Sequence, residues 1–285
     1  MGMQKTHILT HKRLEVFIDT LKMEEKSQHT LAKYERDVRR FYQYCGKKRL
    51  ITKADVIQYK QYLFQNYALS SANSMLTALN RFFKACKWED CQVKLYKMQR
   101  QTYREDQTQL KQEEYRQLMA AAREDGSERL GLLLQTLCAT GIRVSELTYI
   151  TVEAAQQGRT KIWNKGKSRN ILIPQALCAE LLQYAAECKI DKGKIFVTRS
   201  GKDLDRSNIW RALKKLGRAA QVPESKIFPH NLRHLFAKTF YEKQRDIAGL
   251  ADLLGHGSLN TTRIYITDSI DEQKEKLNKM GLCNK

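Results

Sequence analysis

The 285-residue sequence contains no apolar run that approaches the roughly 20 residues required by a membrane-spanning helix. Its first residues, MGMQKTHILTHKRLEVF, also lack the apolar segment of a signal peptide. These absences argue against a membrane protein and against a secreted protein. We therefore expect a cytoplasmic protein that does not use a membrane as a partner.

The sequence also lacks the usual signatures of metal and cofactor sites. Its seven cysteines are scattered, and no two of them form a C-x-x-C pair. Cys86 and Cys91 alone do not make a zinc site, so reduced thiols are the expected state. No Gly-x-x-x-x-Gly-Lys loop for nucleotide phosphates is present. We expect no metal, no cofactor and no small-molecule substrate.

Acidic residues are too few to balance the basic ones. The chain has 31 Asp and Glu against 51 Lys and Arg, which gives a formal net charge of +20. This charge exceeds what solubility requires and predicts a polyanionic partner, bound through phosphate contacts and the release of counterions. The alternative is a generic basic surface that is only solvated.

Hydrophobic periodicity divides the chain into three regions. Residues 10–95 predict four amphipathic helices that form a small bundle with basic faces. Residues 96–112 are polar and without apolar periodicity, which predicts an exposed linker. Residues 113–285 form the larger domain. We expect the basic faces of the bundle to contact a nucleic-acid backbone, although any single such cation is more often only solvated. The candidate residues are Lys33, Arg36, Arg40, Arg81 and Lys84.

A short β region interrupts the helices of the larger domain. Residues Arg159–Trp163 and Asn170–Ile173 are rich in β-branched side chains and predict two strands joined by a basic turn. Lys165 and Lys167 would stand at the tip of this hairpin and reach outward. We include Lys167 and Arg169 among the candidate DNA-contacting residues.

The remaining segments complete the expected fold. Residues Ile195–Val197 are a candidate third strand, and Asn208–Ala219 predict a helix with a basic face. The charged tail, Asp271–Lys285, carries a narrow apolar stripe and is either a helix that docks on a partner or a frayed terminus. The expected fold class is mainly α with a small β-sheet (α+β), in which an N-terminal helical bundle is joined by a linker to the larger domain.

The segment ATGIRVSEL, residues 139–147, ends a strongly apolar helix. Gly141 breaks the pattern and leaves Arg143 next to a buried, Leu-rich run. A buried arginine needs an anionic partner. Glu146, three residues further on, is either that partner or the group that holds the guanidinium for another anion.

The segment HNLRH, residues 230–234, places polar groups on one helix. Pro229 precedes it, as is common at the start of a helix. His230 and Arg233 are three residues apart and therefore share a helix face. His230 and His234 also form an H-x-x-x-H pair, so a zinc site is an alternative. The metalloprotease form of that pair has glutamate in the second position, where this chain has Asn231.

The chain then predicts two more helices and a turn. An amphipathic helix at residues 247–254 stops at Gly255, and Ser258 fits the N-cap of a third, short helix that carries Tyr265. His256 would therefore lie in a tight turn between two helices. Such turns place a side chain at a site rather than in a core.

Taken in order, ATGIRVSEL, the hairpin KGK, HNLRH and LLGHGSLNTTRIY resemble the tyrosine recombinases, also called the phage integrase family. The resemblance covers about residues 113–270, and the helices before them resemble the family's core-binding domain more loosely. It implies a site-specific recombinase, either Xer-like or from a mobile element. Such an enzyme cleaves and rejoins double-stranded DNA through a 3′-phosphotyrosyl intermediate and a Holliday junction, as a homotetramer.

The resemblance also implies a role for each candidate residue. A free tyrosine has a pKa of about 10, so at neutral pH it needs a base and nearby positive charge. Because the phosphotyrosyl bond conserves the energy of the cleaved bond, rejoining needs no ATP. The resemblance implies that Tyr265 is the nucleophile, that Arg143 and Arg233 bind the non-bridging oxygens, and that Lys165 is the acid for the leaving 5′-oxygen. It implies that His230 accepts the tyrosine proton or orients the phosphate, and that His256 donates to a phosphate oxygen. Glu146 and His234 are the implied supporting residues.

The sequence departs from the family pattern at a few positions and leaves alternatives open. Asn231 stands where aspartate is usual, and Asn164 where glycine is common. Lys167 is the alternative to Lys165 as general acid. A type IB topoisomerase-like nicking and religating enzyme would share the chemistry. A catalytically inactive DNA-binding regulator is a third reading, against which the complete residue set argues.

Overall fold

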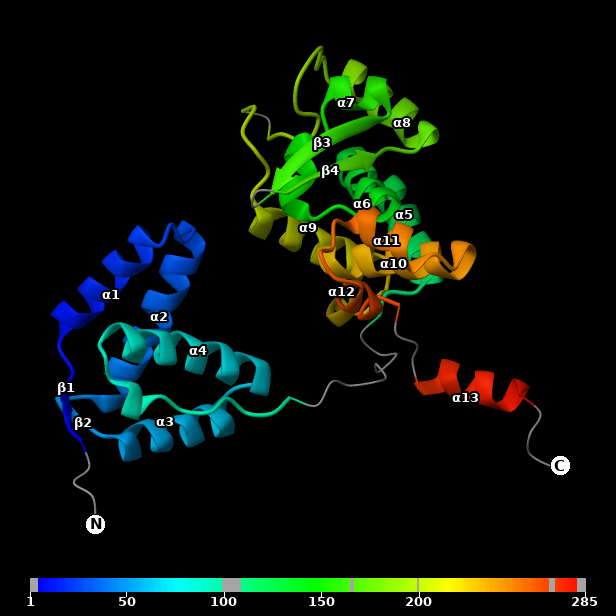
Figure 1. Cartoon of the computed structure of the whole chain (residues 1–285). Coiled ribbons are helices and arrows are strands. Elements are labelled where there is room, and N and C mark those ends of the chain that lie inside the picture. The colour runs from blue at the N-terminus through cyan, green and yellow to red at the C-terminus, as the bar shows by residue number, and fades with distance from the viewer. Residues whose placement is uncertain (1–4, 99–108, 165–166, 199, 267–269, 281–285) are drawn as a thin grey trace. The chain divides into compact units, whose positions relative to one another are not determined.

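The computed structural model of the protein describes residues 5–98, 109–164, 167–198, 200–266 and 270–280 (Figure 1). Its contacts divide the chain into two compact units, Met1–Arg100 and Gln101–Lys285. The expected fold class is confirmed, because helices dominate and the two sheets are small and antiparallel. None of the helices in the described ranges combines the length and apolar character needed to span a bilayer.

The first unit is the expected helical bundle. Its helices are α1 (His11–Met23), α2 (Gln28–Cys45), α3 (Lys53–Asn66) and α4 (Leu69–Ala85), followed by the 3-10 turn η1 (Glu89–Cys91). Their apolar faces close around buried aromatic rings such as Phe17, Phe41 and Phe82. The strands β1 (His7–Ile8) and β2 (Leu50–Ile51) form a small antiparallel sheet that we did not anticipate. Strands of two residues are too short to show a period in the sequence.

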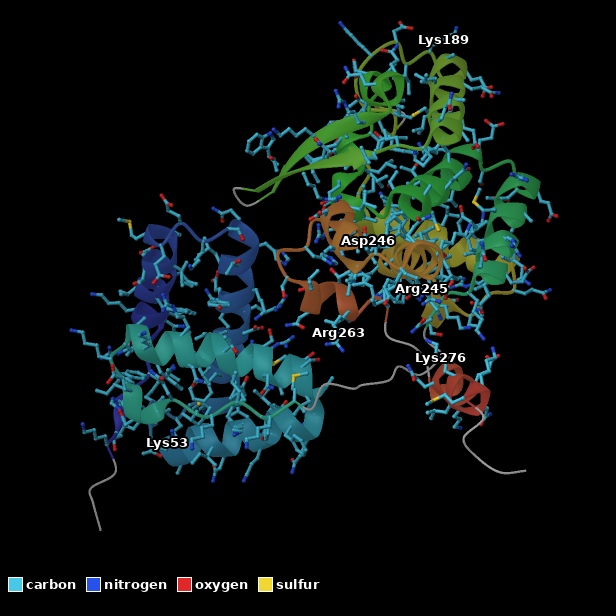
Figure 2. The ribbon with its side chains drawn as sticks, turned by 45° about the vertical axis from the view of Figure 1, so that its right-hand side comes forward. Lys53, Lys189, Arg245, Asp246, Arg263 and Lys276 are labelled. Atoms are coloured by element: carbon cyan, nitrogen blue, oxygen red, sulfur yellow. The ribbon has the colours of Figure 1, made fainter. Side chains whose placement is uncertain are left out.

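The second unit contains most of the helices. Its elements are α5 (Gln112–Glu124), α6 (Glu128–Thr140), η3 (Val144–Tyr149), α7 (Val152–Gln157), β3 (Arg159–Asn164), β4 (Lys167–Leu172), α8 (Gln175–Glu187), α9 (Arg206–Ala219), η4 (Glu224–Lys226), α10 (Pro229–Gln244), α11 (Ile247–Leu254), α12 (Leu259–Arg263) and α13 (Ile270–Lys279). Arg245 and Asp246 connect α10 to α11, and Arg263 ends α12 (Figure 2).

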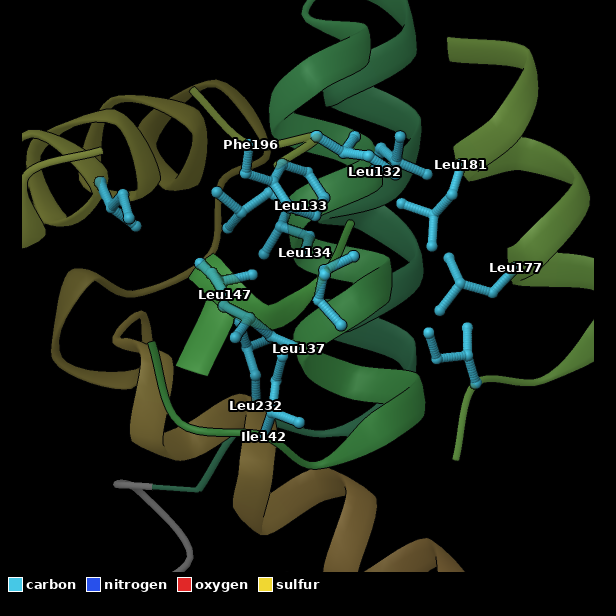
Figure 3. Close-up of a cluster of buried hydrophobic side chains, with 14 of the residues drawn as sticks. Leu132, Leu133, Leu134, Leu137, Ile142, Leu147, Leu177, Leu181, Phe196 and Leu232 are labelled. Atoms are coloured by element: carbon cyan, nitrogen blue, oxygen red, sulfur yellow. The ribbon is translucent and has the colours of Figure 1, made fainter. Parts of the chain in front are cut away.

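Helix α6 is the centre of this unit. It packs against α5, α8 and α10, and it presents Leu132, Leu133, Leu134 and Leu137 to them (Figure 3). Because apolar residues occupy successive positions, α6 is buried on several faces rather than along one stripe. It ends at Gly141, whose φ of +61° is left-handed. A Cβ at this position would overlap the ring of Phe236, so both the turn and the packing favour glycine.

The hairpin of β3 and β4 agrees with the expected pair of strands. It runs in register from Arg159 opposite Leu172 to Asn164 opposite Lys167, and β4 packs against α11. The expectation of a third strand at residues 195–197 is wrong. That segment makes only isolated bridges, one of them between Val197 and Asp203. Its apolar residues instead supply core side chains, and Phe196 is buried.

We expect Leu134→Ala to destabilise the second unit strongly. Leu134 is fully buried in the core around α6, so its truncation removes apolar contacts and leaves a cavity. The free energy of unfolding should fall by about 2–5 kcal/mol, measured by urea denaturation. Leu277→Ala is the control, because Leu277 on α13 is 64% exposed and should cost less than about 0.5 kcal/mol. Equal losses for the two variants would contradict the described core.

Candidate active site

Tyr265 lies beside the helix that carries His230. The hydroxyl of Tyr265 is 3.1 Å from Nε2 of His230, a hydrogen bond between residues 35 positions apart. The expectation that a short helix carries Tyr265 was wrong by two residues, because α12 ends at Arg263. The Tyr265 N–H instead donates to the carbonyl of Thr262 at 2.9 Å, a tighter turn that directs the ring back toward α10.

Three histidine rings surround the ring of Tyr265. His234 stacks on it with centroids 4.1 Å apart and planes 25° apart, and it is buried. The centroid of His256 lies 5.1 Å away, and that of His230 lies 5.3 Å away. The guanidinium carbon of Arg233 is 5.9 Å from the same centroid. The tyrosine ring is therefore held on several sides while its hydroxyl meets a ring nitrogen of His230.

Arg233 carries a buried positive charge. Only 1% of the residue is exposed. Its Nη1 donates to the carbonyl of Gly141 at 2.6 Å, and its Nη2 donates to the carbonyl of Leu254 at 2.7 Å. Both carbonyls belong to the C-terminal ends of helices, where the backbone dipoles favour a cation. Its Nε has no hydrogen-bond partner among the described residues. Burial, followed by the nearby Arg143, lowers the pKa of Arg233 to about 10, so the side chain stays charged at neutral pH.

Glu146 holds Arg143 through two contacts. Oε1 accepts from Nη1 of Arg143 at 3.1 Å, and Oε2 accepts from the Arg143 backbone N–H at 2.8 Å. The interpretation of Arg143 as a buried arginine was wrong, because 40% of its side chain is exposed and Arg233 is the buried one. Ile142 and Leu147 remain in the core, whereas the guanidinium of Arg143 between them reaches the surface and Glu146 stays buried.

Arg169 also contacts Glu146. Its Nη2 lies 2.6 Å from Oε2 of Glu146, and its Nη1 donates to the carbonyl of Leu253. Its side chain is 12% exposed. We expected Arg169 to contact DNA from the hairpin, but its guanidinium points inward and is engaged by protein groups.

His256 is the residue after Gly255, whose φ of +66° ends α11. Its Nε2 lies 3.0 Å from Nη2 of Arg233, and its Nδ1 lies 2.9 Å from Oγ1 of Thr262. A guanidinium can only donate, so Nε2 is the acceptor and Nδ1 carries the proton that is donated to Thr262. Burial, followed by the charge of Arg233, lowers the pKa of His256 to about 4. The ring is neutral at pH 7 and supports Arg233.

Two hollows border Arg143. A cavity of about 240 Å³ is lined by Arg143, His230 and Arg233, together with apolar residues of η3 and α9. A larger groove of about 890 Å³ is lined by Arg143, Glu146, Arg169 and His256. The partly exposed guanidinium of Arg143 is the one that borders both hollows, where an anion can approach it.

The other expected site residues are described in part. Lys165 lies outside the described residues, and so does the side chain of Lys167. The cations of the helical bundle are mostly engaged with neighbours. Lys33 bonds Asp37 at 2.8 Å, Arg36 lies 3.5 Å from Asp37, Arg81 pairs with Glu24, Arg40 lies over the ring of Tyr67, and Lys84 is exposed.

Two groups of the site were missed by the sequence analysis. Thr262 is fully buried and orients His256, and the carbonyls of Gly141 and Leu254 bind Arg233. A threonine followed by an arginine in a short helix carries no distinguishing signal. A backbone carbonyl carries none at all, although the two glycines that end α6 and α11 mark the turns concerned.

The side chains that could hold a metal ion are not those around Tyr265. Among the described residues, the group of three side chains able to hold an ion is His7, Asp90 and Cys91, in the first unit. His7 and Asp90 are 2.9 Å apart and form an ion pair when His7 is protonated. The H-x-x-x-H alternative at His230 and His234 has no third donor of this kind in the described ranges.

Comparisons with known proteins all match this chain to proteins of one family. The phage integrase family matches residues 108–272, and the phage integrase N-terminal SAM-like domain matches residues 14–92. Tyrosine recombinase XerA of Pyrococcus furiosus is 30% identical over 279 residues, which covers 94% of each chain. Tyrosine recombinase XerC of Leptospira interrogans is 28% identical over 290 residues, covering 92% of this chain and 91% of its own. A lambda integrase tetramer bound to a Holliday junction shares the fold, with a TM-score of 0.73, 19% identity, and coverage of 93% of this chain and 78% of that chain.

The neutral state of His256 predicts a sensitivity to acid. Its pKa is about 4 in the folded chain and 6.5 in an ordinary environment. As the pH falls from about 6.5 toward 4, the unfolded chain binds a proton that the folded chain does not bind, so the free energy of unfolding decreases in that window. Urea denaturation between about pH 7 and about pH 5 should show a smaller decrease for His256→Gln than for the wild type.

The control for this measurement is His29→Gln, because His29 is exposed on α2. It should keep the acid sensitivity of the wild type. If His256→Gln and the wild type lose stability equally between the two pH values, His256 is not held neutral in the folded protein.

Proposed function

The chain belongs to the phage integrase family, the tyrosine recombinases, and from that membership we propose how its residues cleave and rejoin DNA. It is a site-specific DNA recombinase that forms a 3′-phosphotyrosyl intermediate and passes through a Holliday junction. The observation that carries the residue assignment is the hydrogen bond between the Tyr265 hydroxyl and His230, next to the guanidinium of Arg233.

Cleavage begins with the proton of Tyr265. His230 accepts it at Nε2, 3.1 Å away, and the phenolate oxygen attacks the scissile phosphorus. The new bond joins the tyrosine oxygen to phosphorus as the bond to the 5′-oxygen breaks. Rejoining reverses these steps, because a free 5′-hydroxyl attacks the phosphotyrosyl bond. One phosphodiester replaces another, so the exchange needs no cofactor.

Positive charge stabilises the transition state. Arg143 and Arg233 bind the two non-bridging oxygens, on which charge grows as phosphorus becomes pentacovalent. Arg233 suits this role because its buried position and fixed carbonyl partners leave little reorganisation during the reaction. A bound phosphate would add negative charge beside His256 and favour its protonation. The ring of His256 would then donate to a phosphate oxygen.

The leaving 5′-oxygen needs a proton. We assign this task to Lys165, with Lys167 as the alternative, because the hairpin tip is where an ammonium group can reach past the phosphate. The remaining bundle and hairpin cations act on the backbone of double-stranded DNA, which the net charge of +20 supports. These contacts are assigned to Lys33, Arg36, Arg40, Arg81, Lys84 and Lys167.

The test is covalent trapping on a nicked suicide duplex. The duplex carries the sequence that the protein protects in the DNA flanking its own gene. Wild-type protein should form a protein–DNA adduct that survives denaturing electrophoresis, and Tyr265→Phe should form none, because it lacks the nucleophilic oxygen. Tyr149→Phe, at an exposed tyrosine of the same unit, is the matched control and should react like the wild type.

The outcomes separate the possible functions. An adduct from Tyr265→Phe would show that another residue is the nucleophile. Sequence-specific binding without any adduct from the wild type would mean a DNA-binding regulator. Adduct formation with relaxation of supercoils, but without joining of two sites, would mean a type IB topoisomerase-like enzyme.

We further propose that a homotetramer acts on two DNA sites in the cytoplasm, as expected for an Xer-like or mobile-element enzyme. The relative bound to a Holliday junction is a tetramer, which supports this assembly. Mass photometry of Tyr265→Phe mixed with duplex sites should give a complex of four protomers and two duplexes. Complexes that never exceed two protomers at saturating DNA would contradict the tetramer.

A further inference from the structure

Arg169 is an arginine of the hairpin that points into the protein. It stands on β4, and its side chain is 12% exposed. Nη2 bonds the carboxylate of Glu146 at 2.6 Å, and Nη1 bonds the carbonyl of Leu253. Its aliphatic stem lies against Gly255 so closely that a Cβ on that glycine would overlap the Cδ of Arg169.

The two bonds of Arg169 lead to the two arginines proposed to bind the phosphate. Glu146 also holds Arg143, through both the guanidinium and the backbone N–H of that residue. Leu253 precedes Leu254, whose carbonyl binds Arg233. The guanidinium of Arg169 therefore connects the hairpin to both of the arginines that are proposed to bind the phosphate.

The same contacts lead to the histidine turn. Gly255, under the stem of Arg169, is followed by His256, and His256 bonds Arg233 at 3.0 Å. Arg169 thus braces the end of α11 from one side, while Thr262 holds His256 from the other. A shift of this turn would therefore shift His256 and Arg233 together.

The chemistry of the contacts requires an arginine. A planar fork of donors can bond a carboxylate and a carbonyl at the same time, whereas a lysine ammonium acts as a single point charge. Placing a guanidinium here has a cost, because burial lowers the pKa of Arg169 and Arg143 adds to that effect. A residue needed only to fill space or to attract DNA would not need two fixed partners inside the protein.

We propose that Arg169 is a positioning residue for strand cleavage, which sets Arg143 through Glu146 and sets His256 and Arg233 through the end of α11. This inference rests on the proposed function. It assigns to Arg169 an effect on the rate of the chemical step and no direct contact with DNA.

The test measures single-turnover adduct formation at saturating suicide DNA, and DNA affinity separately. Arg169→Met keeps an unbranched side chain about as long as the aliphatic stem of the arginine and removes the guanidinium fork. We expect cleavage about 10²-fold slower than wild type, as for a catalytic group displaced by about 1 Å. DNA affinity should stay within about threefold of that of the control, since each variant removes one positive charge and the proposal gives Arg169 no direct contact with DNA. The control is Arg159→Met, at an exposed arginine of the paired strand β3, which should cleave at the wild-type rate.

A double-mutant cycle with Glu146→Gln tests the route of the effect. Because part of the effect of Arg169 passes through Glu146, the double variant should cleave faster than the product of the two single effects predicts. Multiplied effects would mean independent roles and would overturn the proposal. Arg169→Lys retains the charge and replaces the methionine variant if that variant does not fold. It should still cleave more slowly than the wild type. Cleavage at the wild-type rate would also overturn the proposal.

The results distinguish this inference from the proposed function. Wild-type protein without any adduct refutes the proposed function itself. Wild-type and Arg169→Met adducts formed at equal rates refute only the positioning role. A slower rate that DNA saturation restores, with affinity reduced in proportion, would identify Arg169 as a DNA contact and reject the proposal.

Discussion

The burial of the Arg233 guanidinium is the constraint around which the site is built. A charge that is 1% exposed needs compensating groups, and it finds them in the carbonyls that end α6 and α11 and in the ring of His256. Those partners require α6, α10 and α11 to meet at one point. They satisfy Nη1 and Nη2 but leave Nε without a partner among the described residues. A phosphate is the kind of group that completes such a set.

Shared negative charge organises the rest of the site. Arg143 and Arg169 both bond the carboxylate of Glu146, and Arg143 and Arg169 both lower the pKa of Arg233. The cluster therefore has more positive than negative charge before any ligand arrives. Such an excess destabilises the empty site and is relieved by an anion. Burial, followed by this surplus, lowers the pKa of His256 and keeps its ring neutral. In the proposed mechanism a bound phosphate favours protonation of the ring.

Local signals in the sequence predicted the helices of the site well. Pro229 starts α10, Gly255 ends α11 and Ser258 caps α12. Proline fixes its own φ, glycine tolerates a positive φ, and the serine hydroxyl accepts a hydrogen bond from a nearby backbone N–H. Signals that depend on distant partners failed. The apolar residues 195–197 supply core side chains rather than a strand. The sheet of β1 and β2 joins segments too short to show a period.

The order and spacing of the motifs predicted the family and the candidate site residues, and the sequence also predicted the mainly helical class. What each residue touches was decided by the tertiary structure. Arg143 was expected to be buried and is partly exposed, whereas Arg233 is the buried arginine. Arg169 was expected to face DNA and instead binds Glu146. Burial and hydrogen bonding depend on groups up to 92 positions away, as between Arg233 and Gly141, and residue type alone does not specify them. The sequence by itself determined the chemical groups and the local helices; packing of distant segments decided their exposure, partners and charge state.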